Sequence, residues 1–65
     1  MIKITLKELR TEKGFTQETL AEKVGVSRQT IISLEKGTYV PSLDLAFRLA
    51  HILNVSIETL IIWKP

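Results

Sequence analysis

Apolar residues recur at the spacing of an α-helix in five short segments, and cap or turn residues separate these segments. The pattern is clearest in the fourth segment, where Leu45, Leu49 and Leu53 follow one another at intervals of four. The predicted helices span, in chain order, about 6–13, 17–23, 28–35, 43–53 and 57–61. The sequence therefore predicts an all-α domain, although residues 2–5 and 60–63 could each be extended instead.

The predicted helix ends rest on side chains that can satisfy free backbone groups. Thr5 and Glu8 have the spacing of a capping box at the first helix, in which the Thr5 hydroxyl accepts from the Glu8 amide. Hydroxyl residues precede the next three helices, and residues that tolerate a left-handed conformation follow the first four. The former are Thr16, Ser27 and Ser42, and the latter are Gly14, Gly25, Gly37 and Asn54.

Length and composition narrow the possible classes of protein. The chain has 65 residues, no Cys and one His, which excludes a disulfide scaffold, a zinc finger and a thiol nucleophile. One domain, residues 1–65, is expected, stabilised by efficient helix packing or by a partner subunit. No apolar stretch approaches the roughly 18 residues that cross a bilayer, and no signal peptide opens the chain. We therefore expect a cytoplasmic protein without membrane contact.

The segment Gln17–Lys36 has the residue spacing of a helix-turn-helix. Ala21 suits a close crossing of two helices because its side chain is small. Gly25, four residues later, suits the turn because it adopts positive φ without a Cβ penalty. Ile31, six residues after Gly25, can fill the crossing from the second helix.

The stretch TQETLAEKVGVSRQTIISLEKG and the following PSLDLAFRLAHILNVS resemble the phage repressor and Cro (Xre-type) helix-turn-helix family. The resemblance covers about residues 6–60. It implies a compact five-helix, lambda-repressor-like DNA-binding domain, in which the third helix lies in the major groove and the second crosses the DNA backbone. The implied function is that of a transcriptional regulator, which we interpret as a repressor, with a double-stranded DNA operator as partner.

Helical geometry identifies a reading face without the resemblance. If Ile31 and Leu34 point inward, the outward side chains are Arg28, Gln29, Ile32, Ser33 and Lys36. Arg can bridge guanine O6 and N7, Gln can bridge adenine N6 and N7, and an aliphatic side chain can contact a thymine methyl group. The predicted base-reading residues are Arg28, Gln29 and Ser33, with Ile32 as an apolar contact.

Phosphate contacts are expected at helix N-termini, where free amides and the helix dipole favour an anion. Thr16 and Gln17 open the second helix, and the resemblance implies that this Gln braces a phosphate. Lys36, Thr38 and Tyr39 lie on the loop that follows the DNA backbone in the family.

Arg10 has two possible uses. It could contact DNA, or it could pair with Glu35, because it matches a family position that often pairs with a Glu late in the recognition helix. We favour the structural ion pair.

The net charge supports a polyanionic partner only weakly. Nine Lys and Arg against seven Asp and Glu give +2. Residues 1–40 carry seven basic and five acidic side chains, and residues 41–65 carry two of each. The positive excess therefore lies in the half that contains the helix-turn-helix, where DNA is expected to bind.

The end of the chain is unusually apolar, and one short helix cannot bury all of its large side chains. In the simpler interpretation, Leu60 and one or two neighbours complete the core. In the other, residues 57–65 form a two-fold homodimer contact, as the family resemblance also implies. That interface would contain Ile57, Ile61, Ile62 and Trp63, with Phe47 at its edge.

Other functions have less support in the sequence. Asp44, Arg48 and His51 follow helical spacing and are interpreted as a solvated face. No catalytic residues, metal site, cofactor or small-molecule effector site are expected. Two alternatives stay open: an antitoxin-like autorepressor that also binds a protein partner, and a helical interaction module that does not bind DNA.

Overall fold

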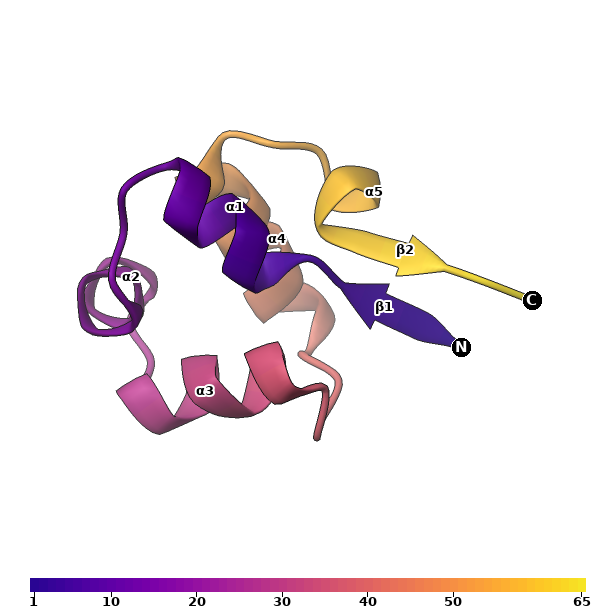
Figure 1. Cartoon of the computed structure of the whole chain (residues 1–65), viewed down its shortest axis with the longest axis horizontal. Helices are drawn as coiled ribbons and strands as arrows, with labels where there is room; N and C mark the ends of the chain where they lie inside the picture. The colour runs from indigo at the N-terminus through magenta and orange to yellow at the C-terminus, as the bar shows by residue number, and fades with distance from the viewer.

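Five helices and a short antiparallel sheet make up the chain. A computed structural model describes all 65 residues. The elements are β1 (Ile2–Ile4), α1 (Leu6–Glu12), α2 (Gln17–Val24), α3 (Arg28–Lys36), α4 (Leu43–Leu53), α5 (Ile57–Leu60) and β2 (Ile61–Trp63). Each predicted helix is present within one residue of its expected ends. Figure 1 shows α2 at one end of the molecule and the sheet with both termini at the other. None of the helices is long and apolar enough to cross a lipid bilayer.

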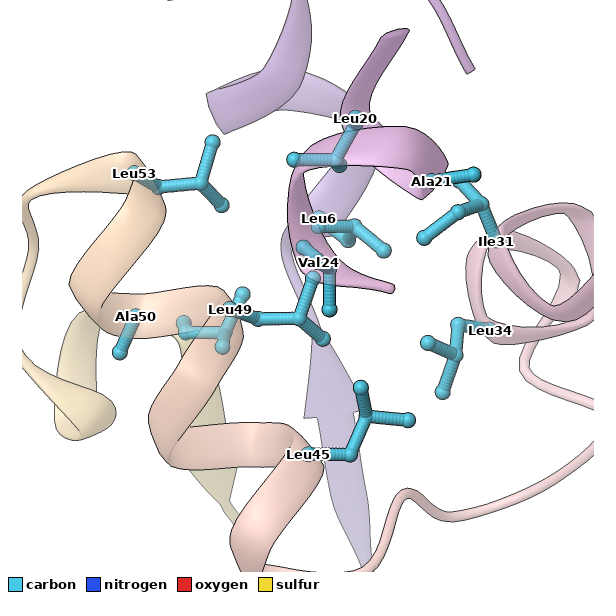
Figure 2. Packing of buried hydrophobic residues seen from close by; sticks show 11 residues of the cluster. Leu6, Leu20, Ala21, Val24, Ile31, Leu34, Leu45, Leu49, Ala50 and Leu53 are labelled. Atoms are coloured by element: carbon cyan, nitrogen blue, oxygen red, sulfur yellow. The ribbon is translucent and has the colours of Figure 1, made fainter. Parts of the chain in front are cut away.

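A cluster of aliphatic side chains holds the helices together. Leu45, Leu49 and Leu53 form one face of α4, and Figure 2 shows this face turned toward side chains of α1, α2 and α3. All members of this cluster are apolar. Hydrophobic burial therefore supplies the packing that a chain of this length requires. The complete cluster is Leu6, Leu20, Ala21, Val24, Ile31, Leu34, Leu45, Leu49, Ala50, Leu53 and Leu60.

Most of the predicted helix ends are confirmed. The hydroxyls of Thr16, Ser27 and Ser42 each accept a hydrogen bond from the amide three residues later. Gly25 and Asn54 follow α2 and α4 in the left-handed conformation, with φ of 85° and 55°. These ends depend only on near neighbours in the chain, which is why the sequence predicts them well.

The capping box predicted at Thr5 and Glu8 is wrong. The Thr5 side chain accepts no capping hydrogen bond. Its hydroxyl instead lies 2.8 Å from the carbonyl oxygen of Thr59 and 3.1 Å from that of Leu60, as a donor. The Thr5 amide also donates to the Leu60 carbonyl, at 2.9 Å. Hydrogen bonds therefore connect the beginning of α1 to the end of α5.

The predicted five-helix, all-α fold is confirmed, and a small two-stranded sheet is added to it. The two terminal segments pair with each other, with Lys3 opposite Ile62 and Ile4 opposite Ile61. The sequence allowed an extended conformation at both ends of the chain, and the pairing of the two ends stabilises that conformation. Because side chains alternate across a strand, Ile4 and Ile61 pack against the core while Lys3 and Ile62 lie on the other face.

Replacing Thr5 by Val removes the hydroxyl with little change of shape. The Thr59 and Leu60 carbonyls then lose the one O–H that they share, and the Leu60 carbonyl keeps the Thr5 amide. We therefore expect the free energy of unfolding to fall by about 1 kcal/mol. Urea titration should show a lower midpoint with an unchanged m value. Thr11→Val, on the exposed side of α1, is the matched control. Equal midpoints for the two variants would show that the Thr5 hydroxyl adds no stability.

Candidate nucleic-acid interface

The predicted helix-turn-helix is built around a tight turn between α2 and α3. The Ala21 carbonyl accepts from the amides of Gly25 and Val26, at 2.9 and 3.0 Å. Gly25 has φ +85°, where a side chain would be strained. Ala21 is buried, and Figure 2 shows it beside Ile31. The small side chain therefore lets α3 pack closely against α2.

The outward face of α3 begins with two long polar side chains. Arg28 and Gln29 are exposed at the start of the helix, as predicted. Ile32 and Ser33 were both predicted to point outward, and both are partly buried, so Ile32 is less exposed than predicted. Gln29 Nε2 lies 3.5 Å from Ser33 Oγ, which is at the long limit of a hydrogen bond. The Gln29 amide is therefore weakly held and can turn toward a base edge.

The carboxylate of Glu35 joins several segments of the chain. Arg10 Nε lies 2.6 Å from Glu35 Oε2, so the ion pair predicted from the sequence is present. Gln17 Nε2 donates to Glu35 Oε1 at 3.0 Å. Arg10 Nη1 donates to the carbonyl of Phe15 at 2.9 Å. The side chains of Arg10 and Glu35 are only 13% and 6% exposed, so Arg10 is used within the fold.

This network also orients Gln17. A side-chain amide has two N–H donors, and Gln17 gives one of them to Glu35. The second is free to bind an anion. Gln17 lines an open polar hollow of about 320 Å³ with Thr16, Glu18 and Arg28. The Thr16 hydroxyl accepts from the Thr19 amide and lies 3.0 Å from the Thr19 hydroxyl, so it is held within the first turn of α2. Arg28 and Gln17 bring further N–H donors to the hollow.

The residues predicted after α3 differ in what they can offer to DNA. Lys36 is exposed, and the side chain of Tyr39 is partly so. The amide and hydroxyl of Thr38 both donate to the Ser33 carbonyl, at 3.1 and 3.0 Å. Thr38 therefore caps α3, and the free donors of this loop are the Lys36 ammonium and the Tyr39 hydroxyl.

The apolar residues at the chain end differ in their exposure. Ile57 and Ile61 are partly buried and pack against the core. Ile62 and Trp63 are 37% and 68% exposed. Ile57 and Ile61 therefore help to complete the core, and Ile62 and Trp63 present more of their apolar surface to solvent.

Arg48 has a role that the sequence reasoning missed. Its Nη1 donates to the carbonyl of Val24 at 2.7 Å, and its Nε lies 2.9 Å from Asp44 Oδ2. Arg48 thus caps the end of α2 from α4. The spacing of Asp44 and Arg48 was a visible signal of their ion pair. The contact with Val24 had none, because it depends on how the two helices cross.

Three known proteins resemble this chain over most of its length. A family profile described as helix-turn-helix matches residues 6–60. The HTH-type transcriptional regulator MJ0272 of Methanocaldococcus jannaschii is 52% identical over 63 residues, which are 97% of this chain and 96% of that protein. The cryptic phage CTXphi transcriptional repressor RstR of Vibrio cholerae is 34% identical, over 94% of this chain and 55% of RstR. SinR, a master regulator for biofilm formation solved in complex with DNA, matches with a TM-score of 0.78 and 34% identity, over 83% of this chain and 87% of that one.

A double-mutant cycle on Arg10 and Glu35 measures how strongly their ion pair holds the domain. Each of Arg10→Met and Glu35→Gln leaves a nearly buried charge without its counter-ion, so the coupling energy in urea unfolding should be about 1–3 kcal/mol. The exposed pair Asp44 and Arg48 is the control, with an expected coupling of about 0.3–0.5 kcal/mol. Equal coupling in the two pairs would contradict a special role for Glu35.

Proposed function

This chain belongs to the helix-turn-helix family of DNA-binding transcriptional regulators, and we propose that it represses transcription by placing α3 in the major groove of an operator. One observation carries the proposal. Exposed Arg28 and Gln29 begin α3 directly beside the polar hollow that Gln17 lines. Groups that can read base edges and groups that can hold a phosphate are therefore adjacent on one surface.

Base readout is assigned to the exposed side of α3. The Arg28 guanidinium can donate two hydrogen bonds to guanine, and the Gln29 amide can pair with adenine through both its donor and its acceptor. Ser33 and Ile32 lie one turn further along, and their accessible parts suit a polar base edge and a thymine methyl group.

Phosphate binding is assigned to both sides of this reading face. The free N–H of Gln17 serves one DNA strand, and Lys36 with Tyr39 serves the other. Thr16 and Thr38 contribute by capping α2 and α3, which fixes the position of these donors. The contacts to phosphate determine affinity and register, whereas those of Arg28 and Gln29 determine sequence preference.

A homodimer completes the proposed operator complex. A single α3 offers only a few base contacts, and a two-fold pair would read two half-sites with centres about 34–36 Å apart. The exposed Ile62 and Trp63 are the proposed centre of the interface, with Phe47, itself 55% exposed, at its edge. The contribution of Ile57 and Ile61 is indirect, since they anchor this segment to the core.

Repression follows from occupancy of the operator, which would exclude polymerase. The similarity to RstR, named a transcriptional repressor, supports this direction of control. We assign the protein a binding role in the cytoplasm, with neither a catalytic step nor a small-molecule effector.

Gln29→Ala and Lys36→Gln should have different effects on DNA binding. Loss of the Gln29 amide removes discrimination at one base pair, worth about 1–3 kcal/mol, so binding to the selected site and to its single-base variants should become more alike. Loss of the Lys36 charge should weaken all sequences equally. Quantitative gel shifts on DNA selected from a random pool measure both effects, with Lys7→Gln as the charge-matched control. If neither substitution alters binding, the assignment of α3 to the major groove is wrong.

Trp63→Glu places a charge at the proposed dimer contact. The variant should sediment as a monomer at concentrations where the wild type is a dimer, because burying an unpaired carboxylate is unfavourable. Leu43→Glu, at another exposed apolar position, on α4, should leave the dimer intact. If Leu43→Glu dissociates the dimer and Trp63→Glu does not, the dimer interface lies on α4 instead.

A further inference from the structure

A second hollow lies next to the end of α3, outside the helix-turn-helix. It has a volume of about 470 Å³ and runs between β1 and the segment that contains the end of α3 and the following loop. Ile2, Lys3 and Ile4 line one side, and Lys36 and Tyr39 line the other. Figure 1 shows β1 beside this loop, with β2 on the far side of β1. We call this hollow the β1 groove.

The charges at the β1 groove are predominantly positive. Lys3 and Lys36 both line it, from different segments of the chain, and both are exposed. Glu35 also lines it, but its carboxylate is engaged by Arg10 and Gln17. Two ammonium groups and the Tyr39 hydroxyl therefore remain as free donors. This donor set suits an anion whose oxygens can accept hydrogen bonds.

The backbone of β1 adds donors on the same side. Lys64 and Met1 exchange backbone hydrogen bonds, and the Thr5 amide donates to the Leu60 carbonyl. In an antiparallel pair, the backbone amides of successive residues point alternately toward and away from the partner strand. The amides of Ile2 and Ile4 therefore point away from β2. The edge that carries these amides is the one beside the groove. An anion in the groove would therefore meet backbone N–H groups as well as lysines.

The position of the β1 groove matches the edge of a DNA major groove. From Arg28 to Lys36 the helix rises by about 12 Å, which is close to the width of the major groove. With the N-terminal end of α3 over the base edges, the end at Lys36 lies at the bordering phosphate backbone. The β1 groove continues the protein surface outward from that point.

We propose that the β1 groove binds a phosphate of the operator backbone, and that Lys3 contacts it from outside the helix-turn-helix. This inference rests on the DNA-binding function proposed above. Lys3 is suited to the role because Ile4, next to it, packs against the core and pairing with β2 holds the strand. A lysine held on a paired strand loses less conformational freedom on binding than one in a loose terminal arm.

Lys3→Gln tests the proposal through the salt dependence of binding. Each phosphate contact contributes about 0.9 to the slope of log affinity against log salt. The proposed homodimer carries two Lys3 side chains, so over a fourfold rise in salt the variant should lose about 12-fold less affinity than the wild type. Its preference among base sequences should not change. Lys7→Gln, which removes the same charge from the exposed surface of α1, should keep the wild-type slope.

Neutral methylphosphonate linkages at single positions of the selected DNA locate the contact. With wild-type protein, one substitution outside the bases read by α3 should weaken binding. With Lys3→Gln the same substitution should have a smaller effect, because only Lys36, Tyr39 and the backbone amides then contact that phosphate. The role of Lys3 would be overturned if Lys3→Gln and Lys7→Gln had the same slope of log affinity against log salt. It would also be overturned if the effects of Lys3→Gln and of a methylphosphonate linkage were additive at every phosphate. Absence of salt-dependent binding by the wild type would instead overturn the proposed DNA-binding function, and this inference with it.

Discussion

The placement of α3 depends on the carboxylate of Glu35. It accepts from Arg10 of α1 and from Gln17 of α2, and it is itself a residue of α3. A carboxylate that is only 6% exposed is costly without such partners, so the three helices must keep the arrangement that supplies them. The aliphatic cluster sets how closely the helices approach, but it is not directional. The hydrogen bonds of Glu35 determine how the three helices are oriented relative to one another. They also leave Gln17 with one oriented N–H donor.

The terminal sheet has a comparable effect at the other end of the domain. Pairing of β1 with β2 directs Ile4 and Ile61 toward the core and leaves Lys3 and Ile62 outside. Ile57 and Ile61 pack against the core, whereas Ile62 and Trp63 are exposed and could be buried by a partner. The pairing of the two chain ends therefore contributes both to the proposed dimer surface and to the surface beside α3.

The fold determines which charged side chains are free on the surface around α3. A net charge of +2 is small for a DNA-binding protein, and several carboxylates lie in the same half of the chain. Glu35, the carboxylate on α3, is neutralised within the fold by Arg10. Arg28 and Lys36 at the two ends of α3 are exposed without a short ion pair to any carboxylate. Local placement, more than total charge, makes this surface suitable for a polyanion.

The sequence by itself determined the helices, most of their caps, the helix-turn-helix and the partner of Arg10. These features follow from near neighbours at helical spacing, or from a family pattern that Arg10 and Glu35 match. The tertiary structure alone decided that the Thr5 hydroxyl bonds to the end of α5, that the termini pair as strands, and that Gln17 and Arg48 reach Glu35 and Val24. Each of these contacts joins residues 18 or more positions apart. Whether such residues meet depends on how the helices cross, and local patterns of apolar and polar residues do not contain that information.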